Sequence, residues 1–152
     1  MKKTLTVYQI QHILYNTTFP KIIIKILGLK KRIVLLCKNK DDVDVLDNLL
    51  WTFSQLSFIP HATENDDFNL DLQDIIITTK LDNKSVIDNR SLVIVSTELI
   101  KNEYVNYTNE VFLITTENID LQAFKENALD TITNKRIIKY FTQRLDNSWK
   151  IN

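Results

Sequence analysis

The chain has a single glycine, Gly28, among its 152 residues. Nucleotide-binding α/β proteins need glycines where a strand turns into a helix, because only a residue without a Cβ lets the backbone approach a pyrophosphate closely. Gly28 instead follows an apolar segment with helical spacing and precedes two lysines, which is typical of a helix end. The sequence therefore excludes a glycine-rich phosphate loop, and with it dinucleotide-binding and P-loop chemistry.

Cysteine and histidine are also scarce. The lone cysteine, Cys37, excludes a disulfide or a multi-cysteine zinc site within the chain, and its place after the apolar run 33–36 predicts a buried, inert thiol. The two histidines, His12 and His61, belong to no recognisable nucleophile–base motif, and His61 is expected to be a hydrogen-bonded turn residue. We expect no cofactor, no small-molecule substrate and no enzymatic activity.

Long hydrophobic runs are absent as well. No apolar stretch approaches the ~20 residues that a membrane span needs, and the first residues lack the apolar core of a signal peptide. We therefore expect a cytoplasmic protein without a membrane partner. The length and the hydrophobic fraction of 44% fit one globular domain over residues 1–152.

The net charge of zero hides a segregation of charge along the chain. Residues 1–40 contain nine lysines and arginines and no acid, with the densest cluster at Lys30, Lys31 and Arg32. Residues 41–79 contain nine acids and no lysine or arginine, and residues 131–152 are basic again. This pattern predicts a patchy electrostatic surface.

Hydrophobic periodicity indicates alternating strands and helices. We expect strands at 5–9, 33–37, 74–79, 91–96 and 111–115. One helix is expected between a cap at Thr17 or Thr18, with Pro20 in its first turn, and Gly28. Asn39 is expected to cap a second helix, and Asp41 and Asp42 to lie in its first turn. A last helical region is expected from 121 to 143.

The strands read as continuous rather than alternating apolar runs, which indicates that both of their faces are buried. The predicted fold is therefore a single-domain, Rossmann-like α/β sandwich of three layers, in which helices flank a mostly parallel central sheet. The second helix ends in Trp51 and is soon followed by Phe58, Ile59, Pro60 and His61. This arrangement can present a hydrophobic ledge, which suits a protein partner.

Trp51 after this helix, together with the block 57–61, resembles the chi subunit of bacterial DNA polymerase III, an accessory subunit of the clamp loader. The first strand with Tyr8, the strand 30–37, the strand that starts at Asp74, and a basic C-terminal helix that ends near Trp149 extend the resemblance over most of the chain. The resemblance implies a non-catalytic adaptor in DNA replication, which reaches DNA through its protein partners.

In that family, chi binds the psi subunit through an apolar surface, which the resemblance places at Trp51, Phe58 and Pro60. Chi also binds the acidic, Phe-ended C-terminal tail of single-stranded-DNA-binding protein. For this tail the resemblance implies basic and aromatic residues on one C-terminal helix: Lys135, Arg136, Lys139, Tyr140 and Arg144. The basic residues that the family carries one and two turns earlier are replaced here by Ala128, Leu129 and Ile132.

Two other functions stay open. The basic N-terminal third could bind single-stranded nucleic acid directly, although the cluster at 30–32 lacks the interleaved aromatics on which bases stack. Alternatively, Glu64, Asp66 and Asp67 near His61 could hold a divalent cation for a small hydrolase. Their spacing matches no known metal loop, so a solvated acidic loop is the simpler interpretation.

Overall fold

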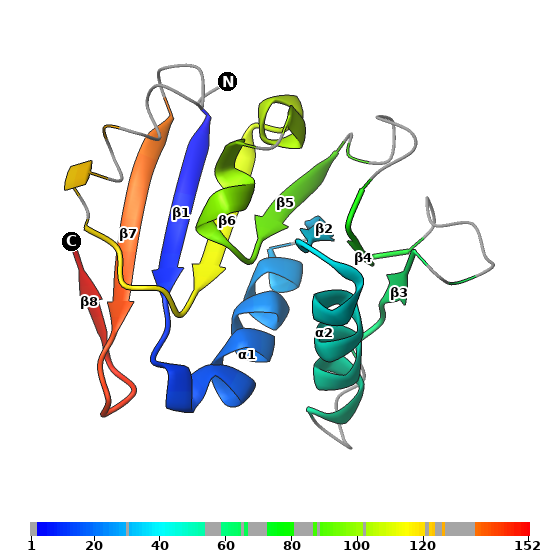
Figure 1. Cartoon of the computed structure of the whole chain (residues 1–152), viewed down its shortest axis with the longest axis horizontal. Coiled ribbons are helices and arrows are strands. Elements are labelled where there is room, and N and C mark those ends of the chain that lie inside the picture. Colours follow the sequence, from blue (N-terminus) through cyan, green and yellow to red (C-terminus); the bar gives the residue numbers. More distant parts are fainter. Residues whose placement is uncertain are drawn as a thin grey trace.

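The computed structural model describes residues 3–29, 31–53, 59–64, 66, 73–80, 87, 89–101, 103–120, 122–123, 126 and 136–152. Within these residues, eight strands form one sheet in the order β3-β4-β2-β5-β6-β1-β7-β8 (Figure 1). All neighbouring strands are parallel except β8, which runs antiparallel to β7. The strands are β1 (Thr4–Gln9), β2 (Arg32–Leu36), β3 (Ala62–Thr63), β4 (Ile75–Thr78), β5 (Arg90–Ile94), β6 (Glu110–Thr115), β7 (Ile137–Gln143) and β8 (Trp149–Ile151).

The sheet separates two hydrophobic clusters, as the continuous apolar runs predict. Along β2, Ile33 and Leu35 enter one cluster, whereas Val34 and Leu36 enter the other, because successive side chains of a strand point to opposite faces. The first cluster is covered by α1 (Tyr15–Gly28) and α2 (Lys40–Thr52), and the second by the 3-10 helices η4 (Thr97–Lys101) and η5 (Glu103–Tyr107). The predicted three-layer, mostly parallel α/β sandwich is confirmed.

The helix α2 begins where its sequence predicts. The side chain of Asn39 accepts a hydrogen bond of 2.9 Å from the backbone N–H of Asp42, and Asp41 and Asp42 occupy the first turn. Carboxylates there are favoured by the positive end of the helix dipole. Val43, Leu46 and Leu50 recur on one face and are buried, so α2 packs on the sheet through a single apolar stripe.

The helix α1 starts earlier than predicted. It begins at Tyr15, directly after the 3-10 turn η1 (His12–Leu14), and places Pro20 inside the helix rather than in its first turn. The hydroxyl of Thr17 donates to the carbonyl of Leu14 instead of capping the helix N-terminus. The predicted end at Gly28 is confirmed.

The prediction of a continuous C-terminal helix is wrong for its last part. Residues Ile137–Gln143 form β7, which pairs with β1, and a turn at Leu145, Asp146 and Asn147 leads into β8. Asn147 has a φ of 72°, a left-handed conformation that asparagine tolerates in turns. Leu145 is 72% exposed in this hairpin. No helix in the described part of the chain is long and apolar enough to cross a membrane.

Candidate protein-binding site

The C-terminal end of α2 presents a large aromatic side chain to solvent. Trp51 is 53% exposed, although its neighbour Leu50 is only 2% exposed. The helical period puts Leu46 and Leu50 toward the sheet and leaves Trp51 on the outer side. Val45, also on the outer side of α2, is 60% exposed. An exposed tryptophan near the end of a helix can anchor a protein partner.

A buried histidine supports this tryptophan. The rings of Trp51 and His61 meet edge to face, with centroids 5.0 Å apart. The His61 Nδ1 lies 2.7 Å from the Ile59 carbonyl oxygen, and its Nε2 lies 2.8 Å from Oδ1 of Asp47. His61 therefore ties the segment before β3 to α2, in agreement with the predicted hydrogen-bonded turn residue.

Of the other two residues predicted for the psi surface, Pro60 and Phe58, the structure describes Pro60. Pro60 directly precedes His61 and is half-buried. Phe58 lies outside the described residues. The structure thus places Trp51 and the Pro60–His61 segment at one edge of the fold, beside the end of α2.

Those residues predicted for the acidic tail that the structure describes do not share a helix face. Lys135 lies outside the described residues, and Arg136 is 6% exposed directly before β7. The Arg136 guanidinium donates to four backbone carbonyls: Thr4 at 3.0 Å, Asn109 at 3.1 Å, Val105 at 2.5 Å and Thr108 at 2.7 Å. Burial lowers the pKa of Arg136. Its cation therefore stabilises the junction of β1, η5 and β6 rather than an exposed basic surface.

Within β7 the predicted tail residues alternate between the two faces of the sheet. Tyr140 is 4% exposed, belongs to the cluster under η4 and η5, and donates its hydroxyl hydrogen bond to Gln9. Lys139 is exposed, as is Arg144 just after the strand. The predicted convergence of Lys135, Arg136 and Lys139 on one helix is therefore wrong for the two described residues, because Arg136 directly precedes β7 and Lys139 lies within it.

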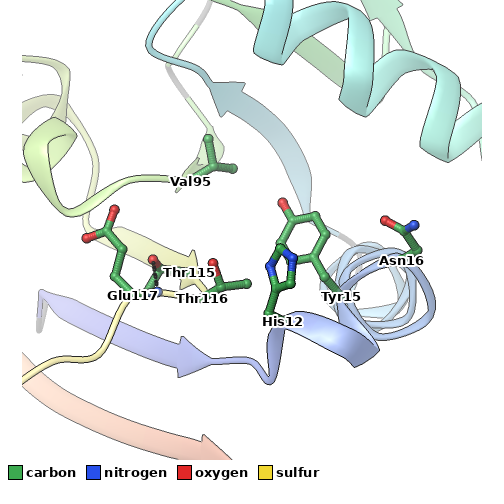
Figure 2. A pocket seen from close by; sticks show the side chains of 7 residues that line it. All are labelled: His12, Tyr15, Asn16, Val95, Thr115, Thr116 and Glu117. Atoms are coloured by element: carbon green, nitrogen blue, oxygen red, sulfur yellow. Dashed lines mark hydrogen bonds between the residues drawn. The ribbon is translucent and has the colours of Figure 1, made fainter.

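The carboxyl ends of β1, β5 and β6 frame a crevice of about 300 Å³ that the sequence analysis missed (Figure 2). Its lining comes from the η1–α1 junction, from the residue after β5 and from the end of β6: His12, Tyr15, Asn16, Val95, Thr115, Thr116 and Glu117. Thr97 donates to the Glu117 carboxylate, and the Glu117 N–H donates to the Thr115 hydroxyl at 3.0 Å. Burial raises the pKa of Tyr15.

Ligands of open α/β sheets commonly bind at the carboxyl ends of the strands, so this crevice is where the fold would place one. The lining offers hydroxyl, imidazole and carboxylate groups for a polar ligand, but no glycine-rich backbone for a phosphate. The signal available in the sequence was His12 and the pair Thr115–Thr116, each close to the end of a predicted strand.

The described acidic residues Glu64 and Asp66 make hydrogen bonds to nearby threonines. Glu64 accepts hydrogen bonds from the hydroxyls of Thr78 and Thr79, and Asp66 accepts one from the Thr63 N–H at 2.7 Å. Among the described residues no three His, Cys, Asp or Glu side chains form a group that could hold a metal ion. Asp67, the third acid of the hypothetical cation site, lies outside these residues.

Fold and site together define a Rossmann-like α/β protein that exposes an aromatic anchor and has no glycine-rich phosphate loop. The family model of the DNA polymerase III chi subunit, HolC, matches residues 3–127, and the chain belongs to this family. Chi proteins are non-catalytic accessory subunits of the polymerase. The match stops before β7 and β8. A comparison with curated proteins found no match.

Proposed function

We propose that this chain is a non-catalytic adaptor that links the clamp loader, through the psi subunit, to the C-terminal tail of single-stranded-DNA-binding protein in the cytoplasm. Family membership supports a role in the polymerase III complex. The observation that carries the proposal is the exposed Trp51, held in place by a buried His61.

The psi-binding surface is proposed to centre on Trp51, with Pro60 and Phe58 beside it. An aromatic anchor at the centre of an interface commonly contributes about 2 kcal/mol or more, provided that its orientation is fixed before binding. The contact with His61 supplies that preorganisation for Trp51, because His61 is itself bonded to both Ile59 and Asp47.

The tail-binding site is proposed to use the exposed cations Lys139 and Arg144, together with Lys135, which lies outside the described residues. Arg136 and Tyr140 contribute indirectly, since their hydrogen bonds join β7 to the neighbouring segments. Charge-assisted hydrogen bonds from lysine and arginine to carboxylates supply the attraction. This binding should weaken with salt, because exposed ion pairs are screened.

Isothermal titration calorimetry of the psi subunit into Trp51→Ala, Trp51→Phe and the unchanged chain tests the first surface. Trp51→Ala should weaken binding about 30-fold, the equivalent of about 2 kcal/mol. Trp51→Phe retains an aromatic ring against His61 and should lose less. Ile13→Ala is the matched control, because Ile13 is an exposed apolar residue on η1. Equal affinities for Trp51→Ala and the unchanged chain would refute this surface.

Fluorescence anisotropy with the labelled acidic tail peptide tests the second surface. The double variant Lys139→Gln/Arg144→Gln should bind the peptide more weakly than the unchanged chain at low salt. Lys80→Gln/Lys101→Gln removes the same charge from exposed positions elsewhere and should bind normally. If both double variants lose affinity equally, only overall charge matters, and the proposed site is wrong.

A further inference from the structure

A second groove lies between α1 and the C-terminal hairpin, away from Trp51. Its volume is about 220 Å³. Tyr8, Ile22 and Trp149 form the apolar part of its lining, and Lys21, Lys25 and Asn147 the polar part. Drug-sized ligands commonly occupy pockets of about 300–1,000 Å³, so this groove suits a single planar ring system better than a larger molecule.

The aromatic side of the groove is rigid. Trp149 meets Tyr8 edge to face, with centroids 5.6 Å apart and an interplanar angle of 74°. Tyr8 in turn stacks on Phe141, with centroids 5.3 Å apart and an interplanar angle of 16°. The Trp149 indole is half-buried, so packing fixes its orientation while part of it stays accessible. A fixed, accessible indole provides a platform on which a planar base can stack.

The opposite side of the groove is cationic. Lys21 and Lys25 are exposed one helical turn apart on α1, about 6 Å along its axis. Among the described residues neither lysine has an ion-pair partner. Lys139 adds a third exposed cation on the sheet face that Phe141 also occupies, because side chains two positions apart on a strand share a face. The acid nearest in sequence to this lining, Asp146, bonds to Ser148 within the turn.

We propose that this groove binds single-stranded nucleic acid, with one base against Trp149 and neighbouring phosphates against Lys21 and Lys25. The pairing of an aromatic platform with a row of cations is the arrangement that proteins use for single strands. A duplex does not fit this groove, because its bases are stacked on one another and cannot reach the indole. The proposal goes beyond the adaptor function, since it adds a direct contact with the strand.

The charge density along the sequence would instead place a nucleic-acid site at the cluster 30–32. In the cluster at 30–32, Lys31 pairs with Glu110 and Arg32 donates to the Gln73 carbonyl at 2.8 Å, so both side chains already serve the fold. Folding instead brings Trp149 to Lys21 and Lys25, more than 120 positions away in sequence. The C-terminal hairpin thus gives Lys21 and Lys25 the accessible aromatic that the cluster at 30–32 lacks.

Anisotropy of a labelled 20-mer of thymidine, titrated with the full chain at several salt concentrations, tests the proposal. Lys21→Gln/Lys25→Gln should weaken binding at least tenfold at low salt. It should also reduce the slope of log K against log salt by about 1.4, because each phosphate contact on a single strand contributes about 0.7. The control Lys80→Gln/Lys101→Gln should change neither quantity, and thermal unfolding should confirm that both variants are folded.

The stacking contact has its own test. In a Trp51→Phe background, Trp149 is the single tryptophan, and its fluorescence should be quenched by the unlabelled oligonucleotide. The proposal would be overturned if the oligonucleotide bound the unchanged chain with no dissociation constant below 100 µM. It would also be overturned if the oligonucleotide bound equally well after both lysine substitutions. It would also fail if the lysine substitutions weakened binding of an acidic peptide but not of the oligonucleotide, since the groove would then be a peptide site.

Discussion

His61 lies beneath Trp51 and holds it edge to face, with a centroid distance of 5.0 Å and an angle of 60° between the rings. The side chain of His61 is itself completely covered, and it contacts Asp47 one helical turn before Trp51 on α2. A buried hydrogen-bonded residue thus sets the position of an exposed one. This relationship explains how a tryptophan at a helix end can be a fixed anchor rather than a mobile side chain.

The first prediction concerns this support. His61→Ala removes the ring contact and leaves the Ile59 carbonyl and the Asp47 carboxylate without their partner. The free energy of unfolding should fall by about 2–3 kcal/mol, since hydrogen bonds that involve a charged group contribute about 1.5–3 kcal/mol. Urea unfolding measures the loss, with the exposed His12→Ala as control. An unchanged midpoint for His61→Ala would show that His61 does not support the helix end.

The second prediction concerns Arg136. Replacing it with methionine retains much of the aliphatic stem but leaves four carbonyls without this donor, two of them in buried and two in part-buried hydrogen bonds. We expect a loss of about 3 kcal/mol in unfolding free energy, because each unsatisfied buried polar group costs about 1–3 kcal/mol and the buried cation itself carries a desolvation cost that partly offsets the loss. Arg144→Met, at an exposed position, should leave stability nearly unchanged. Equal unfolding free energies for Arg136→Met and the unchanged chain would contradict a structural role for Arg136.

The third prediction concerns stability at alkaline pH. Burial raises the pKa of Cys37 from its ordinary value of 9.0 to about 12. Above pH 9 the unfolded thiol loses its proton while the native thiol keeps it, so the native state binds more protons. The unfolding free energy should therefore be unaffected by this group below pH 9. Above it, the free energy should decline by up to about 1.4 kcal/mol per pH unit.

Urea unfolding of the unchanged chain and of Cys37→Ala between pH 8 and pH 10 separates this effect from others. The tyrosines with raised pKa values ordinarily titrate near 10, so the decline that begins near pH 9 comes first from Cys37. The decline with pH should be smaller in Cys37→Ala. Parallel curves for the two proteins would show that the thiol is not shielded from solvent.

The fourth prediction concerns the start of α2. Asn39→Ala removes the oxygen that accepts the Asp42 N–H, and should lower stability by about 1 kcal/mol. Asn39→Asp keeps an oxygen that can accept this hydrogen bond, so it should retain most of the stability that Asn39→Ala loses. Asn48→Ala, at an exposed position within the same helix, should cause no loss, because alanine is the better helix former there. Circular dichroism during thermal unfolding measures all three variants.

Elements specified by local signals could be predicted from the sequence. The continuous apolar runs gave the strands β2, β4, β5 and β6, and the Asn39 cap gave the start of α2. The sequence pattern predicts a helix where the C-terminal hairpin forms, because Ile138, Phe141 and Leu145 recur at nearly helical spacing. The β-branched and aromatic residues of 137–142 and the turn residues Asp146–Ser148 favoured a hairpin instead.

The candidate site was predictable only in part. That Trp51 ends an amphipathic helix is a local fact, and its exposure follows from the helical period. Its contact with His61 depends on how the segment before β3 returns to α2, which no local pattern specifies. The burial of Arg136 was unpredictable for the same reason, because its four carbonyl partners come from β1 and from residues 105–109.

The most direct test of the adaptor function is a bridging measurement. The acidic tail peptide of single-stranded-DNA-binding protein is immobilised on a sensor surface, and the psi subunit is passed over it with and without this chain. We expect psi to be retained only with the chain, and Trp51→Ala to reduce psi retention strongly while the chain itself stays bound. The psi concentration is set high enough to saturate the chain, as measured separately in solution. If the peptide then retains the chain but not psi, the chain does not bridge the two partners and the adaptor function is wrong.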